Sequence, residues 1–576
     1  MQLNLATGPT AIVPDSLVFG ADEFGYNYTG FRAFDRFLTQ LDGSQVGLIT
    51  WPGGAVAELQ TDRFGLEYEG LWNGSEAAGN LAEVMEAAIR LGAGLSIVLP
   101  TVRYLDRPEA LVSDVRGFMA DLLGGQYGPL PDTLILEIGS EYYATYRNIP
   151  DGVAEYARIA DTMLREIDAA VADPTVNLLG ADPEIAMQAG RTVAEDEVIR
   201  DHLSDDALRS VDMVLHHRFA VMATGVDRTA DEMGEVLDNW EEDMASVGGE
   251  RPGLFLGTYN VASYTRGEAL RDYVADMAAQ GITIDRDAVD LEGRTDTAFE
   301  TYWQNRLVRY DYGAEHPRVM LEMMAEYGAE GLGAAGTYGT DMMHAARLTH
   351  TDADGMPVRF VGQDMLDMMA ESIGGTRLLD VSTGNDGSDD VWVYGFENAH
   401  KIILFLSADD LPPGMVTIGL EGFPALRSVQ ADSLTSAVPE DWMDRFGIAD
   451  NPLVDETPES RSFALGIRAG IDPSVTQDGI SILMDQPHQV IRLAFAKDDT
   501  GAAEIAAWSD GTAVDLTDFD GGPPLGAGAP MPILDGDDPL LDDDPDEVEI
   551  DDGTGGGGMG VLGLFALLPL LLMGAA

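Results

Sequence analysis

Carboxylates and aromatic side chains come at the ends of several short apolar runs in this chain. Glu137 and Glu141 flank the end of one such run, in the segment LEIGSEY, and Glu141 lies just past the point where a strand would end. Trp51, Tyr259 and Tyr338 close three other runs. Carboxyl groups supply general acid and base catalysis, and aromatic rings can stack on the apolar face of a sugar. These residue types together indicate a carbohydrate site.

The elements that must position these side chains alternate between short apolar runs and amphipathic segments. Helical periodicity is clear at residues 81–91, 154–170 and 231–244. Eight alternations over about 330 residues favour a closed (β/α)₈ barrel, in which functional residues gather at the carboxyl ends of the strands. The expected strands are residues 16–20, 46–51, 94–100, 133–138, 176–181, 211–217, 253–259 and 331–338.

The pattern of predicted elements changes after the barrel. Short strand-like runs follow one another without intervening helices, which predicts an antiparallel β-sandwich. The expected strands are residues 391–396, 401–406, 415–420, 480–484 and 490–494. The predicted organisation is a barrel at 1–375, a β-sandwich at 376–497, a disordered acidic spacer at 498–558 and a hydrophobic tail at 559–576.

Two motifs resemble the retaining glycoside hydrolases of clan A, in the families of β-xylosidases, α-L-arabinofuranosidases and heparanase-type glucuronidases. Glu137-Ile138-Gly139-Ser140-Glu141 is similar to their strand-four Glu-Ile-Gly-Asn-Glu, and Pro52-Gly53-Gly54 to the end of their strand two. The resemblance covers about residues 16–495. It implies that Glu141 is the general acid/base that protonates the leaving oxygen.

The strand-seven position departs from that pattern. Thr258-Tyr259-Asn260 stands where these families have Glu-Trp-Asn, so Thr258 occupies the position of the nucleophile. A threonine hydroxyl without a base is a poor nucleophile and cannot offset the charge of an oxocarbenium-like centre. Other departures are Thr50 for an arginine, Ser140 for an asparagine that contacts the sugar 2-hydroxyl, and Phe219 for a tyrosine.

Three interpretations follow from this departure. The barrel is a degenerate hydrolase that binds glycans without cleaving them, or it is a hydrolase with a second carboxylate from elsewhere on the rim, or it is an acidic surface protein that binds no sugar. An inverting enzyme needs its two carboxyl groups about 6.5–9.5 Å apart. The candidates for the second carboxylate are Asp22, Glu23, Asp182 and Asp341.

The residues expected to bind substrate lie on the same rim: Trp51, Ser140, His217, Tyr259, Asn260 and Tyr338. His216 and His217 alternate across a strand, and we expect His217 to face the cleft. Trp51 and Tyr338 fit core packing as well as sugar platforms, and Glu137 is expected to pair with an arginine inside the barrel.

The charge balance limits the partners. The formal net charge is −67, with 100 acidic side chains against 33 lysines and arginines. Nucleic-acid binding requires clustered cations, so no nucleic-acid partner is expected. Residues 498–576 hold 18 acidic and no basic side chains, which leaves −49 for the preceding 497 residues. A strongly acidic folded part favours a neutral glycan over a polyanionic one. No metal-binding or cofactor-binding motif is complete, and the chain has no cysteine.

The two ends suggest different things about export. Residues 1–14 have no basic segment and no long apolar segment, so a cleaved signal peptide is not expected. The apolar residues 559–576 follow an acidic spacer and would span about 27 Å as a helix, slightly less than a bilayer core. We therefore expect an extracellular or cell-surface protein whose tail contacts the membrane, with a cytoplasmic location as the alternative.

Overall fold

The structure is a computed structural model. It describes residues 2–4, 12–14, 16–28, 34–53, 57–58, 79–220, 223–261, 266–289, 298–299, 302, 314–339, 348–352, 354–381, 391–408, 413–419, 423–445, 464–476 and 479–517.

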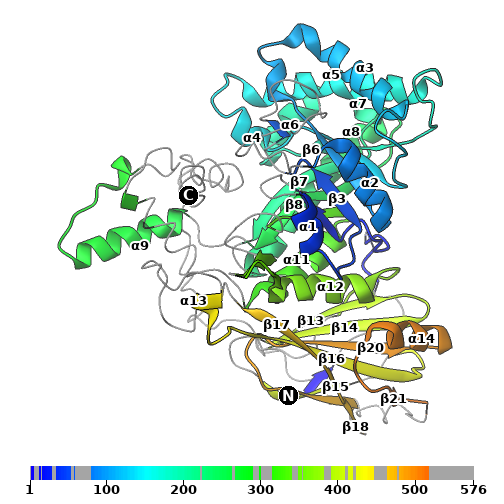
Figure 1. Cartoon of the computed structure of the whole chain (residues 1–576), viewed down its shortest axis with the longest axis vertical. Coiled ribbons are helices and arrows are strands. Elements are labelled where there is room, and N and C mark those ends of the chain that lie inside the picture. Colours follow the sequence, from blue (N-terminus) through cyan, green and yellow to red (C-terminus); the bar gives the residue numbers. More distant parts are fainter. Residues whose placement is uncertain are drawn as a thin grey trace, which may run out of the picture.

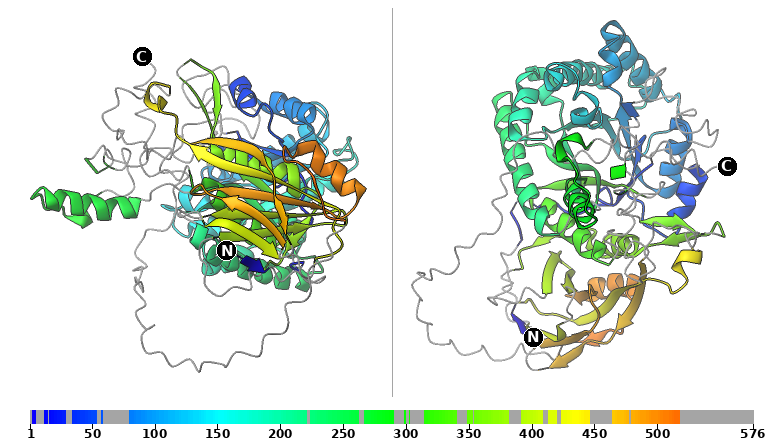
Figure 2. Two further views of the ribbon diagram at one scale, coloured as in Figure 1. Left: turned by 90° about the horizontal axis from the view of Figure 1, so that it is seen from below. Right: turned by 90° about the vertical axis from the view of Figure 1, so that its left-hand side faces the viewer.

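Eight parallel strands close into a barrel, as the alternation of apolar runs predicts. Its helices lie outside the strands (Figures 1 and 2). The strands are β2 (Gly25–Asn27), β3 (Leu48–Trp51), β4 (Gly94–Leu99), β5 (Leu134–Ile138), β6 (Glu184–Gln188), β7 (Met213–Ala220), β8 (Gly253–Val261) and β9 (Leu332–Thr337). The longer outer helices are α2 (Leu81–Leu91), α3 (Leu111–Leu123), α5 (Gly152–Ala172), α6 (Val193–Asp201), α8 (Val226–Ser246), α11 (His316–Ala329) and α12 (Val361–Ile373).

Local sequence explains how these helices begin and end. At the start of α2, the Asn80 side chain accepts from the backbone N–H of Glu83, whose carboxylate accepts from the backbone N–H of Asn80. This capping box satisfies two N–H groups that the first turn leaves without partners. Gly92 ends the helix with φ 70°, a left-handed conformation that glycine adopts without a steric penalty.

The first predicted strand was wrong in position. The structure has β2 at Gly25–Asn27, whereas residues 16–20 form no strand. Phe19 donates its N–H to the carbonyl of Thr376 and accepts from the N–H of Gly375. Within this run Phe19 is buried and contacts Phe396 edge to face, whereas Leu17 and Val18 are exposed.

The fifth predicted strand was also wrong in position, because residues 176–181 form a turn that precedes β6. The Asn177 side chain bonds to the backbone of both Val171 and Ala181 and holds this turn together. Leu178 is 68% exposed, so an apolar residue type misled the assignment.

The second domain consists of two sheets that share one buried core. One sheet contains β12 (Arg377–Leu379), β13 (Val391–Glu397), β14 (Lys401–Ala408), β20 (Val490–Ala496), β16 (Ser428–Ala437), β17 (Leu465–Ile471) and β21 (Val514–Asp515). The other contains β1 (Gln2–Asn4), β15 (Gly414–Gly419), β19 (Gly479–Met484) and β18 (Ser474–Thr476). Side chains from both sheets, such as Leu493 and Ile482, meet in the same hydrophobic cluster. This arrangement fits the predicted sandwich, although β1 pairs parallel to β15.

The boundaries of this domain differ from the prediction at both ends. The strand β1 comes from the start of the chain. Beyond residue 497, where a disordered spacer is expected, helix α14 (Asp499–Trp508) and strand β21 belong to the domain. Asp498 caps α14 by accepting from the N–H of Gly501. The rest of the predicted spacer and the whole tail at 559–576 lie outside the described residues. Within the described part, no helix is long and apolar enough to span a membrane.

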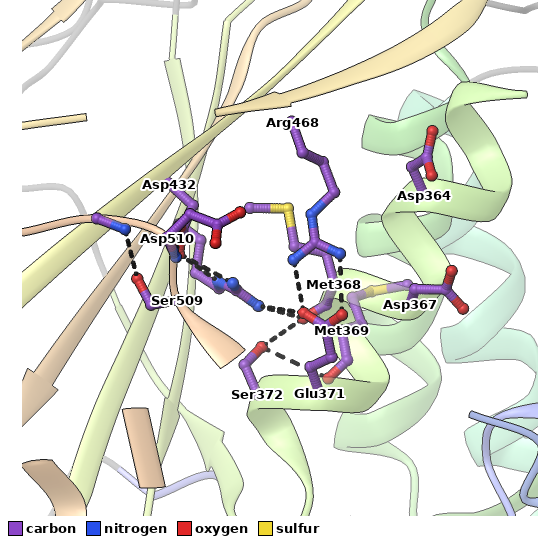
Figure 3. Close-up of polar contacts among 12 residues, drawn as sticks. Asp364, Asp367, Met368, Met369, Glu371, Ser372, Asp432, Arg468, Ser509 and Asp510 are labelled. Carbon is purple, nitrogen blue, oxygen red and sulfur yellow. Dashed lines mark hydrogen bonds and ion pairs between the residues drawn. The ribbon is translucent and has the colours of Figure 1, made fainter. Parts of the chain in front are cut away.

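Helix α12 lies between the barrel and the second domain (Figure 1). A buried network of charges joins it to strands β16, β17 and β20 (Figure 3). Arg492 has no exposed surface and donates to Asp432, to Glu371 and to the carbonyl of Met368. Arg468 donates to both carboxylate oxygens of Glu371, at 2.9 and 2.6 Å. These pairs connect the two domains through side chains that satisfy one another.

Candidate active site

Glu141 lies in the turn that leads from β5 to the short helix α4 (Tyr142–Thr145), at the carboxyl end of the barrel. Its backbone is left-handed, with φ 48° and ψ 53°, and Gly139 also has a positive φ of 75°. A left-handed conformation costs a non-glycine residue about 1–3 kcal/mol, and it persists where the surrounding structure enforces it. The Glu141 side chain is only 2% exposed.

His217, on β7, contacts the Glu141 carboxylate. Its Nδ1 lies 3.3 Å from Oε1 of Glu141. His216 is placed differently: it stacks on Tyr327 of α11 with ring centroids 6.1 Å apart, and burial lowers its pKa to about 3. A register shift separates these two residues. Of the two histidines, the structure thus places His217 beside Glu141.

Thr258, on β8, pairs directly with His217 across the two strands. A Cβ atom at the neighbouring Gly257 would lie 3.2 Å from Nε2 of His217, so the imidazole ring lies against this part of β8. Among the described residues, neither Nε2 of His217 nor the hydroxyl of Thr258 has a hydrogen-bond partner, and both atoms are buried. His217 therefore contacts Glu141 and is the strand partner of Thr258, and polar atoms of His217 and Thr258 are left to bind a ligand.

Tyr143 adds a fourth group next to Glu141. Its pKa is raised well above the usual value by burial and, secondarily, by the Glu141 carboxylate. The phenol therefore stays protonated at physiological pH, where it can act only as a neutral hydrogen-bonding group.

Asn27 and Thr50 extend this polar region onto β2 and β3, where they are register partners. The Asn27 amide donates to the carbonyls of Gly257, at 3.2 Å, and Gly336, at 2.7 Å. Its Oδ1 and the Thr50 hydroxyl are buried without a partner in the described part of the chain. Two carbonyls fix the amide nitrogen, so Oδ1 is an oriented acceptor, and a Cβ atom at Gly53 would lie 2.8 Å from it.

Several residues expected to bind sugar are instead buried in the core. Trp51 and Tyr259 have no exposed surface, and the indole N–H of Trp51 donates to the carbonyl of Gly79 at 3.0 Å. Tyr338 is 2% exposed and contacts Phe219 edge to face. These three rings have almost no exposed surface in this conformation, and their role as sugar platforms stays a prediction.

Asn260 and Ser140 differ in their hydrogen-bond partners. Asn260 is fully buried and donates to the carbonyl of Tyr338, while its Oδ1 contacts Nε2 of His316 at 2.7 Å. It therefore ties β8 to β9 and α11 and is not free for substrate. Ser140 is buried next to Glu141, and its hydroxyl has no partner in the described structure.

The candidates for a second carboxylate mostly lie at the other end of the barrel. Asp22 and Glu23 precede β2, and Asp182 precedes β6, so all three are at the amino ends of the strands. Asp22 accepts from Thr133, which precedes β5. Burial, and then the charges of Asp212, Asp22 and Asp182, raise the pKa of Glu184 at the start of β6. The positions assigned to strands one and five placed these residues on the wrong rim, and Asp341 lies outside the described residues.

Glu137 was expected to pair with an arginine. The partner that the described structure gives it is Ser96, whose hydroxyl donates to its carboxyl group at 2.5 Å. Burial raises its pKa to about 8, so it is mostly protonated at neutral pH. It is thus a neutral hydrogen-bonding group inside the barrel wall.

Glu58 is a buried carboxylate of the rim that the sequence did not single out. It accepts hydrogen bonds from Thr101, Val102 and Ser140. Pro52-Gly53-Gly54 marks the end of β3, but no periodicity or motif distinguishes a glutamate four residues further on. Long-range contacts alone define its position.

No group of three or more histidine or acidic side chains within the described residues could hold a metal ion. The described site consists of a carboxylate, an imidazole, hydroxyls and an amide. Such a set can bind a ligand rich in hydroxyl groups and can exchange a proton with it at Glu141.

No protein-family description matches the sequence, and no curated protein matches it. Solved structures share its fold. A family 51 arabinofuranosidase from Xanthomonas axonopodis pv. citri superposes with a TM-score of 0.52 at 15% identity, over 86% of this chain and 99% of that one. A family 51 α-L-arabinofuranosidase from Bifidobacterium longum gives 0.54 at 12% identity, over 86% and 99%. An α-L-arabinofuranosidase from Thermotoga maritima, in complex with arabinose, gives 0.53 at 13%, over 86% and 100%. The chain therefore has the fold of these glycoside hydrolases.

Proposed function

We propose that this chain acts on a neutral glycan at the carboxyl end of its barrel, with Glu141 as general acid/base. The observation that carries the proposal is the contact between the Glu141 carboxylate and His217, at the end of the fourth barrel strand. In (β/α)₈ barrels, catalytic groups come from the ends of several different strands. A protonated Glu141 would donate to the glycosidic oxygen as the bond to the sugar breaks.

A second candidate is a glycan-binding protein that does not cleave its ligand, and Thr258 favours it. A retaining mechanism needs a carboxylate about 5–5.5 Å from the acid/base. Thr258 holds a hydroxyl at the position of that carboxylate. Of the other acidic residues near the turn, Glu58 has its oxygens engaged by N–H and O–H donors. Hydrolysis would then require a carboxylate outside the described residues, for which Asp341 is the candidate.

The substrate class follows from charge and from the solved relatives. A net charge of −67 disfavours a polyanionic glycan. The solved structures of similar fold are arabinofuranosidases, so arabinofuranosyl groups on a neutral polysaccharide are the first ligand to test.

The test combines a panel of aryl glycosides, including α-L-arabinofuranosides and β-D-xylosides, with calorimetric titration of neutral oligosaccharides. If the chain is a hydrolase, Glu141→Gln should lose at least about a thousandfold in kcat on its best glycoside and keep its affinity. Asp341→Asn should lose activity as well if Asp341 is the second carboxylate. Binding without turnover in the unmodified chain would select the second candidate. A chain that shows no turnover and no binding would overturn both candidate functions.

We further propose that the chain is exported and that residues 559–576 contact the membrane, with a cytoplasmic protein as the alternative. The support is the apolar sequence of this segment behind an acidic stretch. Cell fractionation of the full chain and of residues 1–558 tests it. Recovery of both forms in the cytoplasm would contradict export, and equal release of both from membranes would contradict a contact through the tail.

A further inference from the structure

We propose that Glu58 is a positioning residue for Glu141: its carboxylate fixes the turn that aims the Glu141 side chain at His217. This inference concerns the same site as the proposed function and rests on Glu141 being its working carboxyl group. The argument comes from the hydrogen bonds of Glu58, from the backbone of the turn and from the space around Gly139.

The Glu58 carboxylate joins the ends of two neighbouring barrel strands. Oε2 accepts from the N–H groups of Thr101 and Val102, both at 2.8 Å, just after β4. Oε1 accepts from the Thr101 hydroxyl at 2.7 Å and from the N–H of Ser140 at 3.1 Å, just after β5. Three of the four donors are backbone N–H groups, which can only donate. An ionised carboxylate, which only accepts, is the side chain that matches them.

The peptide that Glu58 holds joins Gly139 to Ser140, the residue before Glu141. Ser140 lies between Gly139, with φ 75°, and Glu141, with φ 48°. Glycine adopts a positive φ freely, but Glu141 holds its left-handed conformation only where the surrounding structure enforces it. The tyrosine side chain of Tyr156 donates to the Ile138 carbonyl at 2.8 Å, and the N–H of Gly139 donates to Leu99. The Ser140 N–H has Glu58 as its acceptor.

The packing at Gly139 shows how closely Glu58 approaches the turn. A Cβ atom at residue 139 would lie 3.1 Å from Oε1 of Glu58 and 3.0 Å from the Thr101 side chain. Glycine is therefore required both for its φ and for the space that the carboxylate occupies. Glu58 is 4% exposed, and burial raises its pKa while its hydrogen bonds oppose the rise.

The consequence is a coupling between Glu58 and the contact of Glu141 with His217. A misplacement of about 1 Å at a reacting group can cost on the order of a hundredfold in rate. Glu58→Gln keeps the size of the side chain but turns one acceptor into an N–H donor, which then faces another N–H. We expect the turn to relax and the Glu141 carboxylate to move away from His217.

The test measures the His217 ring signal by NMR in protein with labelled histidine rings, with the signal assigned through His217→Gln. Glu58→Gln should shift this signal at constant pH in the same direction as Glu141→Gln, and should weaken glycan binding or kcat at least tenfold. Glu371→Gln is the matched control, because it removes a partly buried, hydrogen-bonded carboxylate from the junction between the domains. It should lower the melting temperature without moving the His217 signal.

A folded Glu58→Gln protein with an unchanged His217 signal would overturn the proposal. If this variant does not fold, Thr101→Val provides the test of the proposal. It removes the hydroxyl donor to Glu58 and keeps the backbone donors. It should give a smaller shift in the same direction, and no shift would overturn the proposal. The NMR signal needs no glycan, so a chain that neither binds nor cleaves sugar would refute the proposed function while leaving this test decisive.

Discussion

Two buried polar regions of this molecule are built on opposite principles. At the junction between the domains, Arg492, Arg468, Glu371 and Asp432 satisfy one another through charge-assisted hydrogen bonds (Figure 3). At the carboxyl end of the barrel, polar atoms of His217, Thr258, Asn27, Thr50 and Ser140 are buried and have no partner among the described residues.

The difference in hydrogen bonding distinguishes a region that stabilises the fold from one that can bind a ligand. More than about nine in ten buried polar groups in folded proteins are hydrogen-bonded, so a concentration of exceptions requires an explanation. Paired charges at the junction fix how α12 meets the second domain, and they leave nothing for a ligand. Unpaired atoms at the end of the barrel cost stability in the free protein, and a ligand with hydroxyl groups would satisfy them. Removing a group should therefore be destabilising at the junction and nearly neutral at the rim.

The largest effect on stability is expected for Arg492→Ala. The change leaves the buried Asp432 without the fully buried arginine that pairs with it, while Glu371 keeps only its pair with Arg468. Breaking a buried ion pair costs about 3–5 kcal/mol, and urea unfolding would measure this loss. Arg209→Ala, at an exposed pair with Asp206, is the control and should change the unfolding free energy by less than about 1 kcal/mol. A loss below about 1 kcal/mol for Arg492→Ala would show that the junction does not depend on its charges.

A pH-dependent effect is expected for Glu137→Gln, because the folded-state pKa of about 8 lies above the ordinary 4.5. The folded protein binds this proton more tightly than the unfolded chain does. Its contribution to stability is complete below about pH 4.5 and is lost as the pH rises through about 8. Relative to Glu137→Gln, the unmodified protein should lose about 2 kcal/mol between about pH 6 and pH 8. If the unfolding free energies of the two proteins, measured in urea, changed in parallel with pH, Glu137 would not be a buried, neutral carboxyl group.

The smallest effect on stability is expected for Thr258→Val. The variant keeps the shape of the side chain and removes a hydroxyl that has no partner in the described structure. The unfolding free energy should stay the same or rise by up to about 1 kcal/mol, while calorimetry should show weaker glycan binding. A clear loss of stability would indicate that the hydroxyl is hydrogen-bonded in the free protein, and the rim would then resemble the junction.

The sequence was sufficient for the parts of the fold that depend on local pattern. The alternation of apolar runs and amphipathic segments predicted the barrel, and helices such as α2 fall where the periodicity places them. The errors arose where an apolar run forms no strand and leaves several of its apolar side chains exposed, as at residues 176–181 and 16–20. Apolar composition reports burial or β propensity, and it does not report which segment finds a hydrogen-bonded neighbour.

The site was predictable at the positions that a motif carries and not at those that tertiary contacts define. His217 contacts Glu141 and is the strand partner of Thr258, while the roles of these residues stay predictions. Asp22 and Asp182 were misplaced because a shift of a few residues in a strand assignment moves a side chain from one end of a barrel to the other. Glu58 belongs to no periodic segment, so only the folded chain shows that it holds the turn of Glu141.

A crystal structure of Glu141→Gln with a bound neutral oligosaccharide tests the central claim most directly. The account predicts sugar hydroxyls within hydrogen-bonding distance of Nε2 of His217 and the hydroxyl of Thr258, with the glycosidic oxygen beside residue 141. A glycan bound elsewhere on the molecule, with these atoms still lacking partners, would contradict it.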